Sequence, residues 1–385
     1  MALPRNKYVK EGQEGVYHCF SRCVRRAFLY GFDPLTRRDF SHRKAWLLER
    51  VRHLAAIFAV EVCAYAILAN HYHLILRIRP DLAALWTDME VAARWLSLFP
   101  RHRDRSGAPL APTDVDIRAL ADQPERIALL RKRLCSLSWF MGRLNEFIAR
   151  AANKEDQVKG RFWESRFKCQ ALLDEAAIAA CMVYVDLNLI RAGLAETPEG
   201  SDFTSIQERI RVWQQETMAA GSANEEEAPQ VPQSTPVDGD ISLSNVAAGV
   251  PGPVPESLAP TTDSLDIGSL ELAAPWLCPI SSDTKRRGIL QMTAEEYFDL
   301  VDRSGRLMRS DKRGAMDAGL APILLRIGAN PAVWSETISC FGSRFRLVAG
   351  MLSNLRNLAD QLGKRWFTGV AAARAAFASS GPQSP

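Results

Sequence analysis

Residues 60–78 of this chain read VEVCAYAILANHYHLILRI, two apolar segments with the dipeptide Ala-Asn between them. Apolar, β-branched segments joined by a short connection are typical of an antiparallel pair of strands. Because side chains of a strand alternate between its faces, we expect His71 and His73 on one face, about 7 Å apart, and Tyr72 on the other. The stretch therefore predicts a sheet that presents two imidazoles on the same face.

Further strands and helices are expected on both sides of this pair. Strand and helix do not alternate strictly along the chain, which favours an α+β fold with helices packed on an antiparallel sheet. The helix that follows the last of the predicted strands is expected to begin at Asp174, a good N-cap residue, and to end at Gly193. The predicted strands are 15–22, 60–68, 71–78 and 166–173, and the predicted helices are 41–58, 81–99, 126–151 and 174–192.

Composition excludes several classes of protein. The 385 residues are 47% hydrophobic and 24% charged, which is ordinary for a chain with a large core and excludes collagen-like, coiled-coil and wholly disordered proteins. No stretch approaches the roughly 20 apolar residues that a membrane helix needs, and the N-terminus turns polar before a signal-peptide core can form. We therefore expect a cytoplasmic protein with no membrane partner. The eight cysteines are too dispersed for a disulfide scaffold.

Charge divides the chain into three parts. The net charge is +8 over residues 1–215, −11 over 216–284, which contain no Lys or Arg, and +7 over 285–385. The middle part is rich in Pro, Ser and Ala without helical or strand periodicity, so it is interpreted as a disordered linker. The last part is expected to be a small all-α accessory domain that begins with a capping box at Thr293. Two basic blocks favour a polyanionic partner, although the same charges could simply keep two surfaces soluble.

A candidate metal site combines two distant segments. His71 and His73 could share a divalent ion, and in a helix Tyr184 and Asn188 would lie one turn apart on the same face. A carboxamide oxygen suits hard ions such as Mg²⁺ or Mn²⁺. The alternatives remain open at this point: the histidines could bind backbone or water, Tyr184 could be core, and Asn188 could be a helix cap.

Basic and aromatic side chains interleave before the last predicted strand. This mixture suits single-stranded nucleic acid, because cations pair with phosphates and aromatic rings stack on bases. The alternative is that the aromatic residues are core and the cations form a solvated edge. The candidate DNA-binding residues are Arg161, Trp163, Arg166 and Lys168, together with Arg22, Arg25 and Arg26 after the first strand.

The motifs taken together resemble a known family. His71-Tyr72-His73 matches the histidine–hydrophobe–histidine signature of HUH single-tyrosine transposases, and residues 184–194 (YVDLNLIRAGL) resemble the nucleophile helix of their REP-associated tyrosine transposase branch. Residues 17–22 (YHCFSR) and 160–168 (GRFWESRFK) match as well. The resemblance covers about residues 10–215. Leu189 departs from it, because members commonly carry proline there, a position that shapes the turn rather than the chemistry.

The resemblance implies an HUH, ferredoxin-like nuclease core and a reaction on single-stranded or hairpin DNA. Tyr184 would attack the scissile phosphodiester to give a 5′-phosphotyrosine and a free 3′-hydroxyl, with Mg²⁺ or Mn²⁺ held by His71, His73 and Asn188. Such a DNA strand transferase would work at the nucleoid, and some relatives act as homodimers that exchange the tyrosine. The alternatives are a domesticated, non-catalytic nucleic-acid-binding protein and an unrelated metalloenzyme.

Overall fold

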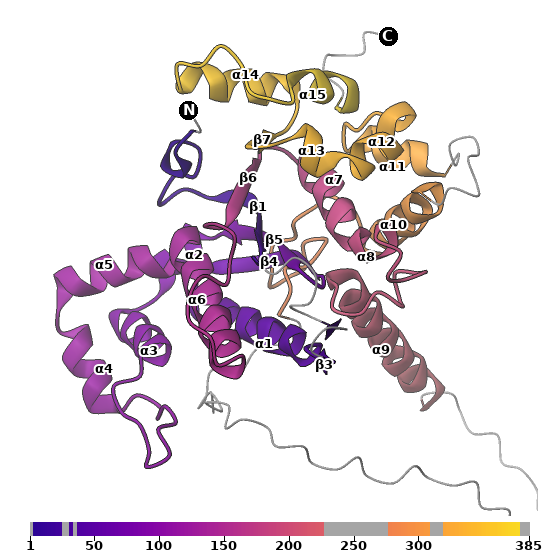
Figure 1. Ribbon diagram of the computed structural model, residues 1–385. Helices are drawn as coiled ribbons and strands as arrows, with labels where there is room; N and C mark the ends of the chain where they lie inside the picture. The colour runs from indigo at the N-terminus through magenta and orange to yellow at the C-terminus, as the bar shows by residue number, and fades with distance from the viewer. Residues whose placement is uncertain (1–2, 25–30, 34–36, 227–275, 309–318, 378–385) are drawn as a thin grey trace, which may run out of the picture.

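The computed structural model describes residues 3–24, 31–33, 37–226, 276–308 and 319–377. Within these ranges, a five-stranded sheet has helices on both of its faces (Figure 1). The fold is therefore mixed α+β, as predicted.

Three of the four pairs of neighbouring strands in the sheet are antiparallel. The strands are β1 (Gly15–Arg22), β4 (Val60–Ile67), β5 (His71–Ile78), β6 (Lys168–Leu172) and β7 (Val348–Ala349). Their order is β4-β5-β1-β6-β7, and only the β6–β7 pair is parallel. β4 and β5 form the expected hairpin, which is closed by a hydrogen bond from Leu68 N to His71 O at 2.9 Å. β2 (Phe32–Asp33) and β3 (Arg38–Asp39) form a separate pair.

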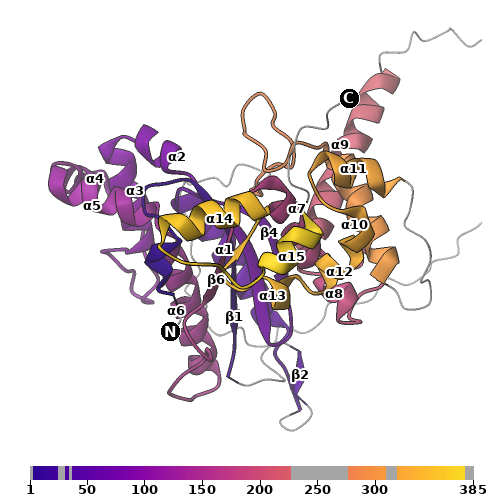
Figure 2. The same cartoon turned by 90° about the horizontal axis from the view of Figure 1, so that it is seen from above.

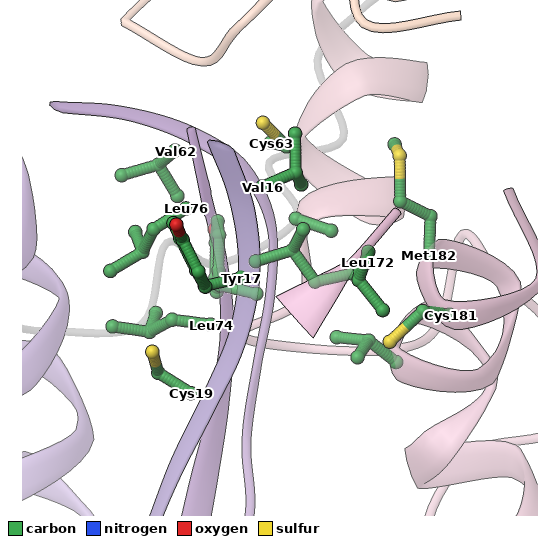
Figure 3. Close-up of a cluster of buried hydrophobic side chains, with 14 of the residues drawn as sticks. Val16, Tyr17, Cys19, Val62, Cys63, Leu74, Leu76, Leu172, Cys181 and Met182 are labelled. Carbon is green, nitrogen blue, oxygen red and sulfur yellow. The ribbon is translucent and has the colours of Figure 1, made fainter. Parts of the chain in front are cut away.

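The sheet has two distinct faces. Figure 3 shows Val16 and Leu172 pointing toward α7, which contributes Met182, whereas Tyr17 lies on the opposite side of the strands. Tyr72, also on that opposite side, donates a hydrogen bond to Asn145 of α6 at 2.7 Å. Helices thus bury both faces of the sheet, which explains the nearly continuous apolar runs in its central strands. The helices that cover it are α1 (His42–Ile57), α6 (Leu137–Glu155) and α7 (Glu175–Asp186).

The helix predicted over 174–192 is divided in two. Asp174 is its N-cap, as expected, because its carboxylate accepts a hydrogen bond from the backbone N–H three residues later. α7 then stops before Leu187, whose ψ of 7° is not helical, and a short helix α8 (Asn188–Arg191) follows. The expected end at Gly193 is confirmed by its φ of +69°, a conformation that favours glycine. The expectation of one continuous helix was therefore wrong at a single residue.

A group of short helices lies beside the sheet, on the side away from the C-terminal helices (Figure 2). The helix predicted over 81–99 is interrupted at Thr87, whose side chain starts α3 with a capping box. The helix predicted over 126–151 is interrupted at Cys135, where α5 ends before α6 begins. The members of this group are α2 (Pro80–Leu85), α3 (Asp88–Leu98), α4 (Asp114–Ala121) and α5 (Pro124–Leu134), and a 3-10 turn, η1 (Arg5–Lys7), precedes β1.

Both described ends of the predicted linker are ordered. α9 (Ser205–Glu226) continues past residue 215, and Leu277 and Cys278 are buried against β4, where Cys278 N donates to Val62 O at 2.9 Å. Trp276 Nε1 also donates to Glu208 of α9 at 2.5 Å. The disordered-linker interpretation of 216–284 therefore does not apply to its ends, because their apolar residues have a surface to pack on. Its middle, 227–275, lies outside the described residues.

The C-terminal region is helical, as predicted, and packs directly on α7 and the sheet. The capping box at Thr293 is confirmed by reciprocal hydrogen bonds with Glu296. The short strand β7 was not predicted, since the C-terminal part was expected to be all-α. The helical elements are α10 (Ala294–Met308), α11 (Leu320–Arg326), η2 (Pro331–Val333), α12 (Trp334–Ser339), α13 (Phe341–Arg344), α14 (Leu352–Gln361) and α15 (Val370–Ala376).

None of the helices in the described ranges combines the length and the apolar character required to cross a bilayer.

Candidate functional site

The two histidines of β5 lie on the sheet face that is covered by α7. In the strand register Phe20 is opposite His73 and Arg22 is opposite His71, so these four side chains share a face. The ring centroids of His71 and His73 are 5.0 Å apart. The expected placement of both imidazoles on one face is confirmed.

A third imidazole, that of His18 on β1, joins the pair. His18 Nε2 lies 2.8 Å from His73 Nδ1, and their rings stack with centroids 5.0 Å apart. The other ring nitrogen, Nδ1, lies 3.2 Å from Oε1 of Gln170 on β6. His18, His73 and Gln170 are buried, and His71 is half-buried. Sequence reasoning assigned no role to His18 or Gln170, although strand alternation from Phe20 would have put His18 on this face.

The environment keeps the three imidazoles neutral. Burial lowers the pKa of His18 to about 4. Burial, followed by the nearby Arg22 and Arg191 guanidiniums, lowers the pKa of His71 to about 4 as well. The pKa of His73 is also lowered, first by burial and then by its two histidine neighbours. A neutral imidazole has one nitrogen with a free lone pair, so each ring can accept a hydrogen bond or ligate a metal.

Tyr184, near the end of α7, faces this cluster. Its ring centroid lies 5.7 Å from that of His73 and 6.0 Å from that of His18, with both contacts edge-on. The C-terminal region supplies the opposite wall: the ring of Phe341 is 5.9 Å away. A Cβ added to Gly342 would come within 2.9 Å of the tyrosine hydroxyl oxygen. The tyrosine hydroxyl is therefore held between the sheet and α13.

Asn188 is separated from Tyr184 by the break at Leu187. It is buried, and its side-chain oxygen accepts a hydrogen bond from Arg191 Nη2 at 3.1 Å. Its Nδ2 has no hydrogen-bond partner among the described residues. The Arg191 guanidinium also lies over the Tyr184 ring. Arg191 thus connects the predicted nucleophile to the predicted amide ligand, a role that the sequence did not indicate.

A cavity of about 250 Å³ opens where these groups meet. Its lining combines two features needed to receive a phosphodiester, namely cations for the phosphate and a hydroxyl that can reach it. The lining residues that carry this chemistry are Arg22, His71, His73, Arg166, Lys168 and Tyr184. Glu164 is a carboxylate in the same lining, and Asn188 is not among the lining residues.

The predicted DNA-binding residues fall into three groups. Arg22, Arg166 and Lys168 are exposed and line the cavity, whereas Arg161 is exposed outside the lining. Trp163 is half-buried: its ring packs edge-on against Tyr72 and Phe162, and its Nε1 donates to the Asn145 carbonyl at 2.9 Å. Its indole is thus partly committed to the core. Arg25 and Arg26 lie outside the described residues.

The candidate metal ligands fit a cation in part. His71 Nδ1 lies 2.5 Å from the Asn70 side-chain oxygen and His73 Nδ1 contacts His18, so Nε2 is the nitrogen left for a ligand in both rings. In the described part of the chain, no three His, Cys, Asp or Glu side chains are arranged to hold a metal ion. Two imidazoles would leave most positions around an ion to other ligands, and water and substrate phosphate are ligands that Mg²⁺ commonly keeps.

Comparison with known proteins gives a likeness to a solved structure. No protein-family model matches the chain, and no curated protein matches it. The solved structure is that of a REP-associated tyrosine transposase bound to a REP hairpin, with 13% sequence identity and a TM-score of 0.33. The alignment covers 55% of this chain and 86% of the other. A likeness of this strength leaves the family open, so the functional argument below rests on the side chains of this chain.

Proposed function

We propose that the protein is a DNA endonuclease and strand transferase, a transposase, that uses Tyr184 as nucleophile on single-stranded or hairpin DNA and depends on Mg²⁺ or Mn²⁺. The observation that carries the proposal is the position of the Tyr184 ring, 5.7 Å from the His73 ring at a cavity with three cationic side chains. A structural tyrosine would not need this combination of neutral imidazoles, guanidiniums and open space.

The proposed reaction exchanges one phosphoester for another. The phenolic oxygen of Tyr184 forms a bond to the scissile phosphorus, the bond from phosphorus to the 3′ oxygen breaks, and that oxygen takes up a proton as the phenol loses one. The 5′-phosphotyrosine conserves the ester, so a second 3′-hydroxyl can reverse the step and join strands. Phenol ionises only near pH 10, so it needs activation at neutral pH.

The chain's own groups would lower the barrier to this attack in two ways, both of which act on the phosphate. The guanidiniums of Arg22 and Arg166 and the ammonium of Lys168 would neutralise the phosphate and orient it. His71, His73 and Asn188 would hold the cation, which when bound draws charge from the phosphate oxygens. Asn188 can serve only if its oxygen leaves Arg191, to which it is bonded in this structure.

Tyr184 would act within its own chain, because it already contacts the histidines of the same chain. A homodimer that exchanges tyrosines is therefore not required by the proposed reaction.

A covalent-adduct assay tests the proposal. The full chain is incubated with Mg²⁺ or Mn²⁺ and labelled hairpin DNA that has single-stranded flanks, and the mixture is separated under denaturing conditions. We expect a labelled protein band that is lost in Tyr184→Phe, which keeps the ring and removes the hydroxyl. Tyr17→Phe, on the opposite face of the sheet, is the matched control and should retain the band. Equal bands from both variants would reject Tyr184 as nucleophile.

One observation favours a second candidate, a non-catalytic nucleic-acid-binding protein. The Asn188 oxygen, a proposed cation ligand, is occupied by Arg191. A pure binder would retain salt-dependent DNA affinity but give no adduct with either ion, so the same assay separates the two candidates.

A further inference from the structure

The amide of Gln170 connects the C-terminal region to the histidine cluster. Its Nε2 lies 2.5 Å from the backbone carbonyl oxygen of Phe345. A carbonyl oxygen can only accept, so the Gln170 nitrogen must be the donor in this contact. The side-chain oxygen of Gln170 is consequently the atom that faces His18 Nδ1, 3.2 Å away.

The orientation of Gln170 determines the proton positions of two histidines in succession. An amide oxygen only accepts, so His18 carries its proton on Nδ1 and has its lone pair on Nε2. That lone pair faces His73 Nδ1 at 2.8 Å, so His73 must donate from Nδ1. A neutral His73 with its proton on Nδ1 has its free lone pair on Nε2.

We propose that Gln170 and His18 are positioning residues that hold His73 in the Nδ1–H tautomer, so that Nε2 is the nitrogen available to a cation or substrate. The inference deepens the proposed function and rests on it for its purpose. Ligand histidines commonly donate their second ring N–H to a fixed acceptor, which sets both tautomer and ring orientation. Here the acceptor is an imidazole that is itself fixed by an amide.

Burial allows only one arrangement of donors and acceptors in this series of hydrogen bonds. Gln170 and His18 are each 1% exposed and His73 is 4% exposed, so water has little access to replace a lost partner. An unpaired donor or acceptor at such a depth is costly. The arrangement with every contact satisfied is the one in which donors point from His73 to His18 to Gln170, and from Gln170 to the Phe345 carbonyl.

The C-terminal region is therefore part of the site. The Phe345 carbonyl is held by its neighbours: Ala171 N donates to Leu347 O at 2.9 Å, and the Phe345 ring packs on those of Phe341 and Phe377.

His71 reaches the same tautomer independently, through the Asn70 side chain. Loss of the Gln170 contact should consequently affect His73 and spare His71.

The test is the ring tautomer of each histidine, read from long-range ¹H–¹⁵N correlations of ¹⁵N-histidine-labelled full-length protein without metal or DNA. For wild type we expect His73 and His18 wholly as Nδ1–H. In Gln170→Leu, and in His18→Phe, His73 should become a mixture of tautomers while His71 is unchanged. Ile75→Val, a buried change on the same face, should leave all tautomers as in wild type and controls for loosened packing.

Metal affinity gives a second readout that needs no catalysis. Free Mn²⁺ titrated by electron paramagnetic resonance should bind about 10–100-fold more weakly to Gln170→Leu than to wild type or Ile75→Val. The inference would be overturned if His73 of the wild type is protonated on Nε2 or is present as both tautomers. It would also be overturned if the tautomer of His73 is unchanged in both Gln170→Leu and His18→Phe. If wild type forms the adduct but its His73 is a mixture of tautomers, the positioning role alone is rejected. If His73 is wholly Nδ1–H but no adduct forms, the proposed function alone is rejected.

Discussion

The guanidinium carbon of Arg191 lies 4.2 Å from the centre of the Tyr184 ring. Arg191 also donates to the Ser339 carbonyl at 3.2 Å, so its position is fixed by α12 as well as by Asn188. A cation over the ring stabilises negative charge on the phenolic oxygen, and that charge grows when the proton leaves. The two residues therefore act as a pair if Tyr184 is the nucleophile.

Arg191→Ala should slow adduct formation about tenfold or more, which corresponds to ~1.4 kcal/mol of transition-state stabilisation. Arg191→Lys keeps the positive charge but lacks the planar guanidinium, so its rate of adduct formation should lie between those of wild type and Arg191→Ala. Single-turnover rates at saturating DNA give the comparison. Equal rates for wild type and Arg191→Ala would show that this cation has no part in the reaction.

Gly342→Ala should abolish or strongly reduce adduct formation in a protein that still folds. The new Cβ would lie 2.9 Å from the Tyr184 hydroxyl oxygen, so the hydroxyl must shift from its present position beside α13. Gly142→Ala is the matched control, because a Cβ at that position in α6 meets nothing within 4 Å. The control should keep full activity and gain about 0.5–1 kcal/mol in stability. Full activity in Gly342→Ala would mean that the hydroxyl position near α13 is unimportant.

Asp186→Ala should lower the free energy of unfolding by about 2–4 kcal/mol, because buried donors lose their acceptor. The Asp186 carboxylate accepts from Ser205 Oγ at 2.5 Å and from Tyr297 Oη at 2.5 Å, and so joins α7 to α9 and α10. Chemical denaturation provides the measurement. Asp299→Ala, which removes an exposed carboxylate paired with the half-buried Arg303, should cost less than about 1 kcal/mol. Similar losses for both variants would contradict this role of Asp186.

DNA affinity should fall steeply as salt rises if the cations at the cavity bind phosphates. Arg166→Ala and Lys168→Ala should each weaken binding and reduce the slope of log affinity against log salt by about 1. Arg150→Ala, an exposed arginine of α6 paired with Glu146, should leave the slope unchanged. Fluorescence anisotropy over a salt series measures all of these slopes. A slope that none of the variants alters would place the DNA elsewhere.

Strand alternation and helix capping depend on residues that are close in the sequence, so the parts of the fold that follow from them could be predicted. Strand alternation correctly placed His71 and His73 on one face and Tyr72 on the other. The helix that carries Tyr184 begins at its predicted cap, Asp174, because a side chain can satisfy a free backbone N–H wherever the sequence supplies one. The order of strands and helices was enough to predict the α+β class.

Contacts between distant segments carried no such signal. Phe341 and Gly342 pack on Tyr184 across more than 150 residues of chain, and nothing in their local sequence indicates that partner. The docking of Leu277 and Cys278 on β4 is of the same kind, since a short apolar segment within an acidic, proline-rich stretch looks like linker until its surface is known. The break at Leu187 also escaped prediction, because the sequence there has no proline or glycine.

The central claim is most directly tested by locating the covalent bond. The protein is incubated with Mn²⁺ and hairpin DNA, treated with nuclease and trypsin, and analysed by tandem mass spectrometry. The account predicts a nucleotide 5′-phosphate attached to Tyr184 in the peptide 169–191. A nucleotide attached to any other side chain, or an unmodified Tyr184 in protein that has cleaved the DNA, would contradict it.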